Sequence, residues 1–440
     1  MVEAPNEPRR VRGVPLAALV ALYLGTAALP LLIASLSGVP RASFRDEVAT
    51  GLALVVFAMV LLEFVLAGRS RWITRHAGID VVIRLHQLFG WTIVVFVVLH
   101  PVLYSTGFSG QRLTGWALAS GMLALVLILA LVGQAIFRRE AENYETWRVV
   151  HAASAVLIAG LGAHHAIEAG RYSERAPLAI YWGAMIGIAL FSLLHVHALT
   201  PLRQRRQAYR VASVRPAALK MWELRVEPVA TSSFAFEAGQ FVWLTLDRSP
   251  FRVTEHPFSM SSAPGDLPGV AFLIKEAGDF TNGIGAIPAG ARAYLDGPHG
   301  NFTVAGRAGK GLAFLAGGVG IAPILGILRD LAQRGERRPL KLLYGNRCAE
   351  QIVARAELES LAGRLALETT LILTEPPPDW TGEVGQPDDA MLRKHLARPD
   401  AAEWLYFVCG PNPMMDQAER TLAALGVPLR NIVSERFSYD

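Results

Sequence analysis

The chain has 440 residues, of which 52% are hydrophobic and 18% charged, with a formal net charge of +5 at pH 7. This composition is too apolar for an ordinary soluble protein and too charged for a membrane bundle alone, so it predicts a membrane half joined to a soluble half. The arginines gather beside apolar runs, as topology signals do, and no nucleic-acid partner is predicted. The two cysteines, Cys348 and Cys409, are too few for a cysteine-ligated iron–sulfur cluster or a disulfide framework.

Six apolar runs in the first 200 residues are each long enough to cross a hydrocarbon core of about 30 Å. Basic residues gather in alternate connecting segments, beginning with the N-terminal arm. The positive-inside rule therefore predicts a multi-pass protein of the cell inner or plasma membrane, with both termini in the cytoplasm. The first run lacks a small-residue cleavage site, which indicates a retained helix. The runs are Val14–Leu36, Val48–Ala67, Ile79–Tyr104, Leu113–Phe137, Trp147–Ile167 and Pro177–Leu199.

Histidines occur in matched positions of the third and fifth runs. His86 and His100 are 14 positions apart, about 40° short of four helical turns and about 21 Å along the axis, so they share nearly one face. His151 begins a similar arrangement that ends at His164 and His165. The predicted topology makes the two helices parallel, so neutral imidazoles meet at two depths and predict two haems, each with two axial histidines. A straight helix favours His165 over His164 as the partner of His100, but both stay open.

From about residue 209 the pattern changes to short β-rich runs separated by Gly, Pro and Asp, which predict an antiparallel β-barrel. After Gly309 strands alternate with glycine-rich turns and helices, which predicts a parallel α/β nucleotide-binding domain. The predicted domains are a six-helix transmembrane di-haem domain (1–205), an FAD-binding barrel (206–306) and an NAD(P)H-binding domain (307–440).

Several motifs in the soluble half suit cofactor binding. The short hydroxyls and exposed amides of residues 256–262, HPFSMSS, suit a flavin and its pyrophosphate. The glycines of residues 317–323, GGVGIAP, stand at a strand-to-helix turn, where backbone N–H groups can approach a dinucleotide pyrophosphate. Cys409 ends another strand, where a nicotinamide could lie, and Phe437 or Tyr439 could stack on the flavin.

These motifs follow one another in a recognisable order. The segments HPFSMSSAP, IKEAGDFT, GPHGNF, AGGVGIAP, YGNR, VCGPNP and a terminal ERF, behind helices with paired histidines, resemble the transmembrane ferric reductase / NADPH oxidase superfamily, nearest its bacterial members without a calcium-binding domain. The resemblance implies FAD on a ferredoxin-reductase-like barrel, NAD(P)H and two b-type haems, the inner one held by His86 and His151. In this family both 13- and 14-residue spacings occur in the second histidine pair. Animal oxidases carry a further histidine at the position of Tyr104.

The motifs and the resemblance together give a set of candidate site residues. The metal ligands are His86, His100, His151, and His164 or His165; the FAD-binding residues are His256, Pro257, Phe258, Ser259, Ser261, Ser262, Lys275, Thr281 and Gly297; the nucleotide-binding residues are Gly317, Gly318, Gly320, Pro323, Arg347, Gly410 and Pro411; and Cys409 and Phe437 are placed at the reacting rings.

The predicted function is electron transfer from cytoplasmic NAD(P)H, through FAD and two haems, to a small-molecule acceptor across the membrane. O2, giving superoxide, is the first choice of acceptor; a ferric or cupric chelate is the second, and a quinone or partner protein the third. Arg347 slightly favours NADPH over NADH, and membrane lipid is expected around the helices without an obligate protein partner. The alternative from another class is a nucleotide-regulated transporter or proton channel, but Glu63 is the only acid deep in a span.

Overall fold

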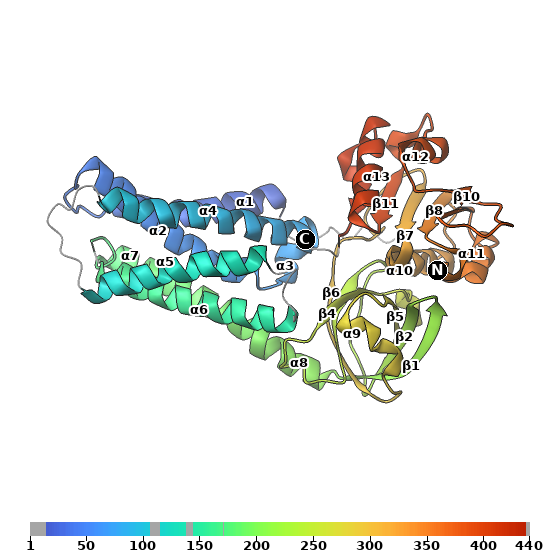
Figure 1. Ribbon diagram of the computed structural model, residues 1–440, viewed down its shortest axis with the longest axis horizontal. Helices are drawn as coiled ribbons and strands as arrows, with labels where there is room; N and C mark the ends of the chain where they lie inside the picture. Colours follow the sequence, from blue (N-terminus) through green and yellow to red (C-terminus); the bar gives the residue numbers. More distant parts are fainter. Residues whose placement is uncertain (1–14, 106–114, 138–143, 170, 437–440) are drawn as a thin grey trace, which may run out of the picture. The chain divides into compact units, whose positions relative to one another are not determined.

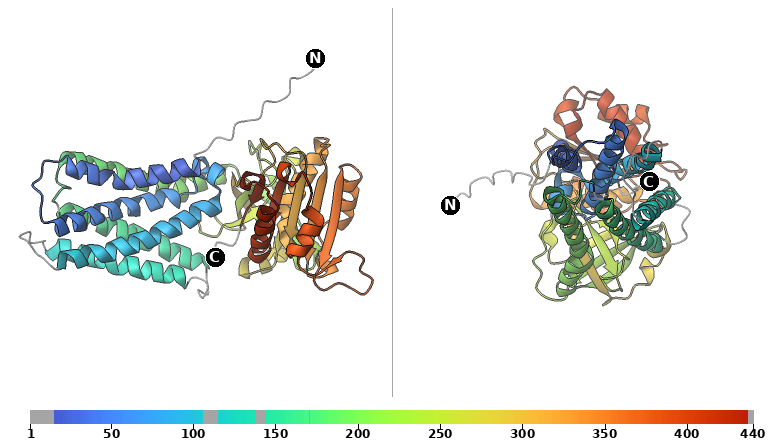
Figure 2. Two further views of the ribbon diagram at one scale, coloured as in Figure 1. Left: turned by 90° about the horizontal axis from the view of Figure 1, so that it is seen from above. Right: turned by 90° about the vertical axis from the view of Figure 1, so that its left-hand side faces the viewer.

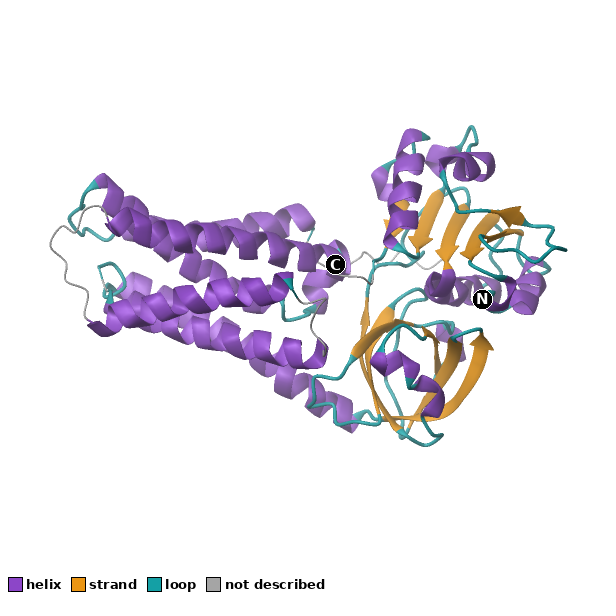
Figure 3. Cartoon of the chain, in the orientation of Figure 1, coloured by secondary structure: helices purple, strands orange, loops and turns teal. Residues whose placement is uncertain are grey.

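The computed structural model describes residues 15–105, 115–137, 144–169 and 171–436. These residues form two compact units, Gly13–Pro201 and Leu202–Asp440, which are described separately below. The first unit is helical, and the second contains two sheets with helices (Figures 1 and 3).

Six helices in the described part of the first unit are long and apolar enough to cross a membrane. The sequence predicted these six spans. They run side by side (Figure 2). A short helix α3 (Arg71–Ala77) connects the second span to the third, and the sixth continues through a π-helical turn (His195–Leu199) into α8 (Thr200–Arg206). The six helices are α1 (Leu16–Ser35), α2 (Phe44–Leu66), α4 (Ile79–Ser105), α5 (Gly115–Ile136), α6 (Tyr144–Glu168) and α7 (Ala176–Leu194).

The helix α2 begins four residues before the apolar run predicted from Val48. Its start is fixed by Ser43, whose side chain accepts a hydrogen bond from the Asp46 backbone N–H at 3.2 Å. Asp46 and Glu47 lie in the first turn, where negative charge is favoured by the helix dipole. Hydropathy alone does not register such a polar first turn. In the bundle α2 packs against α1, α4, α6 and α7, so its side chains can reach groups on several other helices.

The second unit begins with an antiparallel sheet in the order β4-β3-β6-β1-β2-β5. A bridge between Met260, just after β4, and Phe272 of β5 joins its two edges, and buried aliphatic and aromatic side chains fill the interior. The predicted antiparallel barrel is therefore confirmed. Its strands are β1 (Tyr209–Ala218), β2 (Met221–Pro228), β3 (Phe241–Leu246), β4 (His256–Ser259), β5 (Val270–Lys275) and β6 (Arg292–His299), with a short helix α9 (Asp279–Asn282) after β5.

The rest of the second unit is a parallel sheet in the order β10-β9-β8-β7-β11-β12, which confirms the predicted α/β domain. One face is covered by α10 (Ile321–Gln333) and α11 (Arg355–Ala362), and the other by α12 (Asp389–Leu396) and α13 (Asn412–Ala424) (Figure 1). The strands are β7 (Leu312–Gly317), β8 (Leu340–Asn346), β9 (Leu367–Leu373), β10 (Glu383–Val384), β11 (Leu405–Cys409) and β12 (Ile432–Ser434).

The strand order places a topological switch point between β7 and β11. From β7 the chain proceeds outward through β8 and β9 on one side, and it later returns to β11 on the other side. In open parallel sheets, ligands bind outside the carboxyl ends of the strands at such a point. Gly317 and Cys409 are the last residues of these two strands.

Candidate functional site

The histidines of α4 and α6 face one another in two pairs. The ring centroids of His86 and His151 are 6.4 Å apart, and those of His100 and His165 are 6.2 Å apart. The first histidine of α4 meets the first of α6, and the second of α4 meets the last of α6, so the two helices run parallel. His164 lies on a different side of α6, is exposed, and contacts the Ser120 hydroxyl through Nδ1 at 3.0 Å.

Neighbouring helices orient three of the four paired rings through their Nδ1 atoms. His100 Nδ1 lies 2.8 Å from the Ala49 carbonyl oxygen, and His165 Nδ1 lies 2.8 Å from that of Ala117. A carbonyl oxygen only accepts, so both Nδ1 atoms carry the proton and both Nε2 atoms keep a free lone pair. A metal-ligating histidine usually donates a hydrogen bond from its other ring nitrogen, the one that does not bind the metal, to a carboxylate or a carbonyl oxygen. The His165 ring also lies close against Gly121 of α5, where any side chain would collide with it.

His86 has a stronger partner than the other rings. Its Nδ1 lies 2.5 Å from the Glu63 carboxylate of α2, and Tyr23 of α1 donates its hydroxyl hydrogen to the other Glu63 oxygen at 2.5 Å. The Nδ1 of His151 is buried without a hydrogen-bond partner among the described residues. The sequence singled out Glu63 as an intramembrane acid but gave no signal that it contacts His86, because the two residues lie on different helices.

The spacing of the paired rings suits a metal held between them. Two imidazoles on one metal, with bonds of about 2 Å to each nitrogen, have ring centroids about 6 Å apart, as both pairs have here. An added Cβ at Gly90, one turn after His86 on α4, would meet no atom within 4 Å, which leaves space beside the first pair. The described residues contain no group of three or more His, Cys, Asp or Glu side chains that could hold a metal ion. Two ligands per metal are sufficient for a haem, whose ring supplies the others.

The residues predicted to bind FAD lie on β4 and the loop after it. His256 to Ser259 form β4 itself, which pairs with β3. Burial leaves the Ser261 hydroxyl without a partner among the described residues, so it is available to a bound group. The Ser262 hydroxyl instead accepts a hydrogen bond from the Ala271 backbone N–H at 3.1 Å. The loop is held by Arg329 of α10, which donates to the Ser261 carbonyl oxygen at 2.7 Å.

The other predicted FAD-binding residues lie on separate elements of the barrel. Lys275 is exposed at the end of β5. The Thr281 hydroxyl accepts hydrogen bonds from the backbone N–H groups of Ala277 (2.8 Å) and Gly278 (3.0 Å), so it shapes the start of α9. Gly297 lies in β6, where a Cβ would come within 2.7 Å of the Val242 side chain. These positions support the barrel locally as well as being candidate ligand contacts.

The glycine-rich turn after β7 meets the end of β11. A Cβ at Gly320 would lie 2.2 Å from the Cys409 carbonyl oxygen, and one at Gly317 would lie 2.7 Å from the Pro411 ring. Gly410 likewise has no room for a side chain beside Met414. Gly318 differs, because its φ of +53° favours glycine and an added Cβ would point into open space. The turn is thus open on the side of this Cβ at the start of α10, where Pro323 occupies the first turn.

Cys409 and Glu435 lie buried near the carboxyl end of this sheet. Cys409 is 3% exposed and Glu435 2% exposed. Burial, reinforced by the Glu435 carboxylate, raises the pKa of the Cys409 thiol well above its ordinary value, so the thiol is uncharged at neutral pH. A Cβ at Gly300 would lie 2.5 Å from Glu435 Oε1, which brings the segment after β6 together with the C-terminal strand. Phe437 lies outside the described residues, as does Tyr439.

Arg347 follows β8 at the same edge of the sheet as Gly317. Its guanidinium pairs with Glu375 at 2.9 Å, and both side chains are largely exposed. A phosphate of a dinucleotide would therefore have to compete with Glu375 for this arginine.

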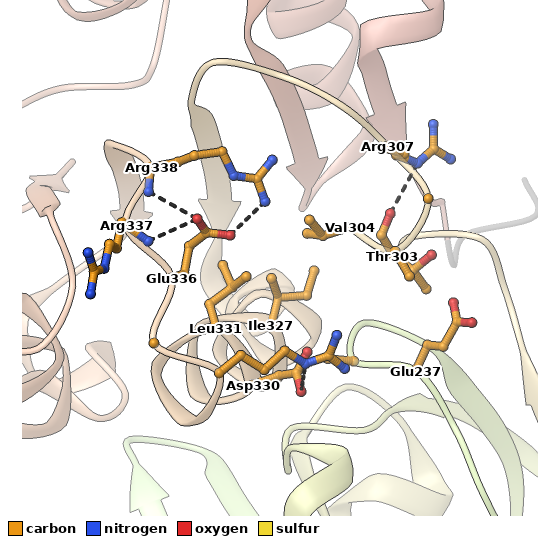
Figure 4. Close-up of a pocket in the computed structure, with 15 residues that line it drawn as sticks. Glu237, Thr303, Val304, Arg307, Ile327, Asp330, Leu331, Glu336, Arg337 and Arg338 are labelled. Carbon is orange, nitrogen blue, oxygen red and sulfur yellow. Dashed lines mark hydrogen bonds and ion pairs between the residues drawn. The ribbon is translucent and has the colours of Figure 1, made fainter. Parts of the chain in front are cut away.

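A separate hollow of about 490 Å³ lies at the amino ends of β7 and β8 (Figure 4), lined mainly by residues 303–307 and 330–338. Its charges are largely balanced internally: Arg338 donates to Glu336 at 2.7 Å and, with further backbone donors, lowers the pKa of Glu336 to about 2. Arg307 donates to the Thr303 carbonyl oxygen at 3.0 Å. Because it lies at the strand ends opposite Gly317, this hollow is distinct from the predicted nucleotide site.

Two protein families match separate parts of the chain. The family described as ferric reductase like transmembrane component matches residues 52–162, and the one described as oxidoreductase NAD-binding domain matches residues 314–420. The first match contains Glu63, His86, His100 and His151 and ends before His165.

Two curated relatives each match about half of the chain, and one solved structure matches most of it. Ferredoxin–NADP reductase B of Sorangium cellulosum is 32% identical over 236 residues, which are 52% of this chain and 96% of that protein. The reductase component of propane 2-monooxygenase from Rhodococcus jostii is 30% identical over 239 residues; the match covers 52% of this chain but only 63% of that protein. The crystal structure of flavohemoglobin from Malassezia yamatoensis with bound FAD and heme covers 90% of this chain and 99% of its own, with a TM-score of 0.52 and 16% identity. At that identity the likeness concerns the fold alone.

The fold and these matches define a membrane oxidoreductase whose soluble half is an FAD- and NAD(P)H-binding reductase module. The chain belongs to the ferric reductase / NADPH oxidase superfamily, with a module of the ferredoxin–NADP reductase type.

Proposed function

We propose that this protein passes electrons from cytoplasmic NAD(P)H, through FAD and two haem b groups, to O2 on the opposite side of the membrane, giving superoxide. The observation that carries the proposal is the pair of facing histidines at each of two levels, with ring centroids 6.4 and 6.2 Å apart, in the same chain as a reductase module. FAD supplies the conversion of a two-electron hydride into single electrons, which haem iron can carry.

In this proposal four histidines hold the two haems. His86 and His151 are the ligands on the cytoplasmic side, and His100 and His165 those on the outer side. His165 is preferred to His164 because its ring faces His100, whereas His164 is exposed and contacts Ser120. The orientation, with both termini in the cytoplasm, rests on the basic residues of alternate loops.

The soluble residues bind and orient the two other cofactors. The β4 residues His256, Pro257, Phe258 and Ser259, with the Ser261 hydroxyl, contact FAD. The turn Gly317–Gly320 offers backbone N–H groups to the dinucleotide pyrophosphate at the start of α10. Cys409, whose raised pKa keeps its thiol uncharged, lies beside the nicotinamide, and either Phe437 or Tyr439 stacks on the flavin. Arg347 would favour NADPH over NADH by leaving its ion pair with Glu375 and binding the 2′-phosphate of NADPH.

A ferric or cupric chelate is the second candidate for the acceptor. Two observations favour it: the matching membrane family is described as ferric reductase like, and Tyr104 stands where animal oxidases carry a histidine. The Tyr104 hydroxyl is 2.6 Å from the Thr50 hydroxyl, and its ring meets the His100 ring edge-on at 5.3 Å. This site therefore has neutral hydroxyls beside the outer histidine pair, where the oxidases have an imidazole.

Sealed vesicles test both the route and the acceptor. Purified protein is reconstituted with FAD and haem, NADPH is added to the outside, and the lumen contains either a superoxide probe or a ferric chelate. Molecules with the soluble half outward should generate superoxide in the lumen. Reduction of the entrapped ferric chelate without superoxide would establish the second candidate instead. NADPH consumption that reduces neither entrapped acceptor, while external acceptors are reduced, would contradict transmembrane transfer.

A further inference from the structure

The two histidine pairs differ in the charge of the groups that support them. His86 is hydrogen-bonded through Nδ1 to the Glu63 carboxylate, whose side chain is only 12% exposed. The rings of the other pair, His100 and His165, are hydrogen-bonded only to backbone carbonyl oxygens through Nδ1. A carboxylate draws the Nδ1 proton much more strongly than a neutral carbonyl does, which gives the imidazole partial imidazolate character.

Glu63 is itself held in place by a second donor. Tyr23, buried in α1, donates to Oε1 at 2.5 Å, while Oε2 faces His86. The Tyr23 ring is stacked on Phe89 of α4 with centroids 3.9 Å apart. Helices α1, α2 and α4 therefore meet at this carboxylate, and the Glu63 side chain is aimed at one histidine of one pair.

From this asymmetry we propose that Glu63 is a positioning residue that makes the His86 imidazole a more electron-rich axial ligand than His100 or His165. The His86–His151 haem then has a lower reduction potential than the His100–His165 haem. The inference rests on the proposed function. A more electron-rich ligand stabilises the ferric over the ferrous state, because the ferric iron carries the greater positive charge. An electron then passes downhill from the first pair to the second, in the direction that the reductase module requires.

Redox titration of the detergent-purified, full-length protein measures this directly, since two haems with different potentials titrate as two components. Glu63→Gln keeps the size of the side chain and removes its charge. We expect it to raise the reduction potential of the lower component and to leave that of the upper component unchanged, so that the difference between the two potentials becomes smaller.

Tyr23→Phe provides a second variant with the opposite expected sign. It keeps the aromatic ring on Phe89 and removes only the hydroxyl that competes for the carboxylate. Glu63 then interacts more strongly with His86, and the lower component should shift further down. Glu47→Gln is the matched control: it lies on the same helix, about 24 Å away along the axis, and contacts Tyr172, Arg171 and the Ala42 N–H rather than a histidine. It should leave the lower component unchanged.

The possible outcomes separate this inference from the proposed function. Opposite shifts of one component in E63Q and Y23F support it. If neither variant changes the two haem potentials of the native protein, the inference is overturned and the electron-transfer function stays intact. A shift of the same sign in both variants has the same consequence. If E63Q fails to retain haem, the direction of the Y23F shift decides. A native protein that binds no haem overturns both the inference and the proposed function.

Discussion

Replacing His165 by alanine is expected to remove one of two haems per chain and to end electron transfer across the membrane, whereas H164A is expected to keep both haems. The two residues are neighbours on α6, so they share depth and helix environment. Only the His165 ring faces His100, at a centroid distance of 6.2 Å, with its Nδ1 fixed on the Ala117 carbonyl oxygen. His164 is exposed and contacts Ser120.

Haem content per chain, from the pyridine haemochrome spectrum and protein concentration, distinguishes the two variants. Flavin reduction by NADPH should stay normal in both, because the soluble half is unchanged. Loss of the haem in H164A with retention in H165A would reverse the assignment, and two haems in both variants would reject His165 and His164 alike as ligands.

Replacing Gly318 by alanine is expected to raise the KM for NAD(P)H about tenfold, which corresponds to about 1.4 kcal/mol of binding free energy. Its φ of +53° is strained for alanine, and the new Cβ points into the open space at the β7 turn where a pyrophosphate would lie. The backbone N–H groups of the turn could then approach the phosphates less closely. FAD content should not change.

Gly335→Ala is the matched control for this change. Gly335 has a φ of +67°, also with open space around an added Cβ, but it lies just after α10 and away from the β7 turn. Both variants introduce one left-handed alanine and should lose about 1–2 kcal/mol of folding stability. Steady-state kinetics with an artificial acceptor compare them. An equal rise in KM in both variants would assign the effect to backbone strain and not to the turn.

Much of the architecture could be predicted from the sequence because its determinants are local. Apolar runs marked the six spans, and the change to short β-rich runs and glycine-rich turns marked the barrel and the parallel sheet. The predicted start of α2 was four residues too late. The helix begins at the Ser43 cap with a charged first turn, which lies outside the apolar run that hydropathy detects.

The site could be predicted only as far as spacing allows. The 14-residue separation pointed to His165, and in the structure it is this ring that faces His100. The supporting groups could not be found this way: Glu63 is 23 residues from His86, and Ala117 is 48 residues from His165. Backbone carbonyls have no sequence signature, and the contacts depend on how α2 and α5 pack beside α4 and α6.

Membership of an oxidoreductase superfamily argues against a nucleotide-regulated transporter or proton channel, the alternative that the sequence left open. The histidines come in facing pairs, which suits axial ligation, whereas a proton relay needs a chain of titratable groups along the span. Glu63, the acid deep in α2, contacts His86 and Tyr23 and thus belongs to one histidine pair.

The most direct test of the central claim is the optical spectrum of the detergent-purified protein before and after anaerobic addition of NADPH. We predict the bands of six-coordinate, bis-histidine b-type haem at two per chain, which become reduced only when FAD is bound. A protein that binds FAD and oxidises NADPH with an artificial acceptor but shows no haem band would contradict the account, because the facing histidines would then not be haem ligands.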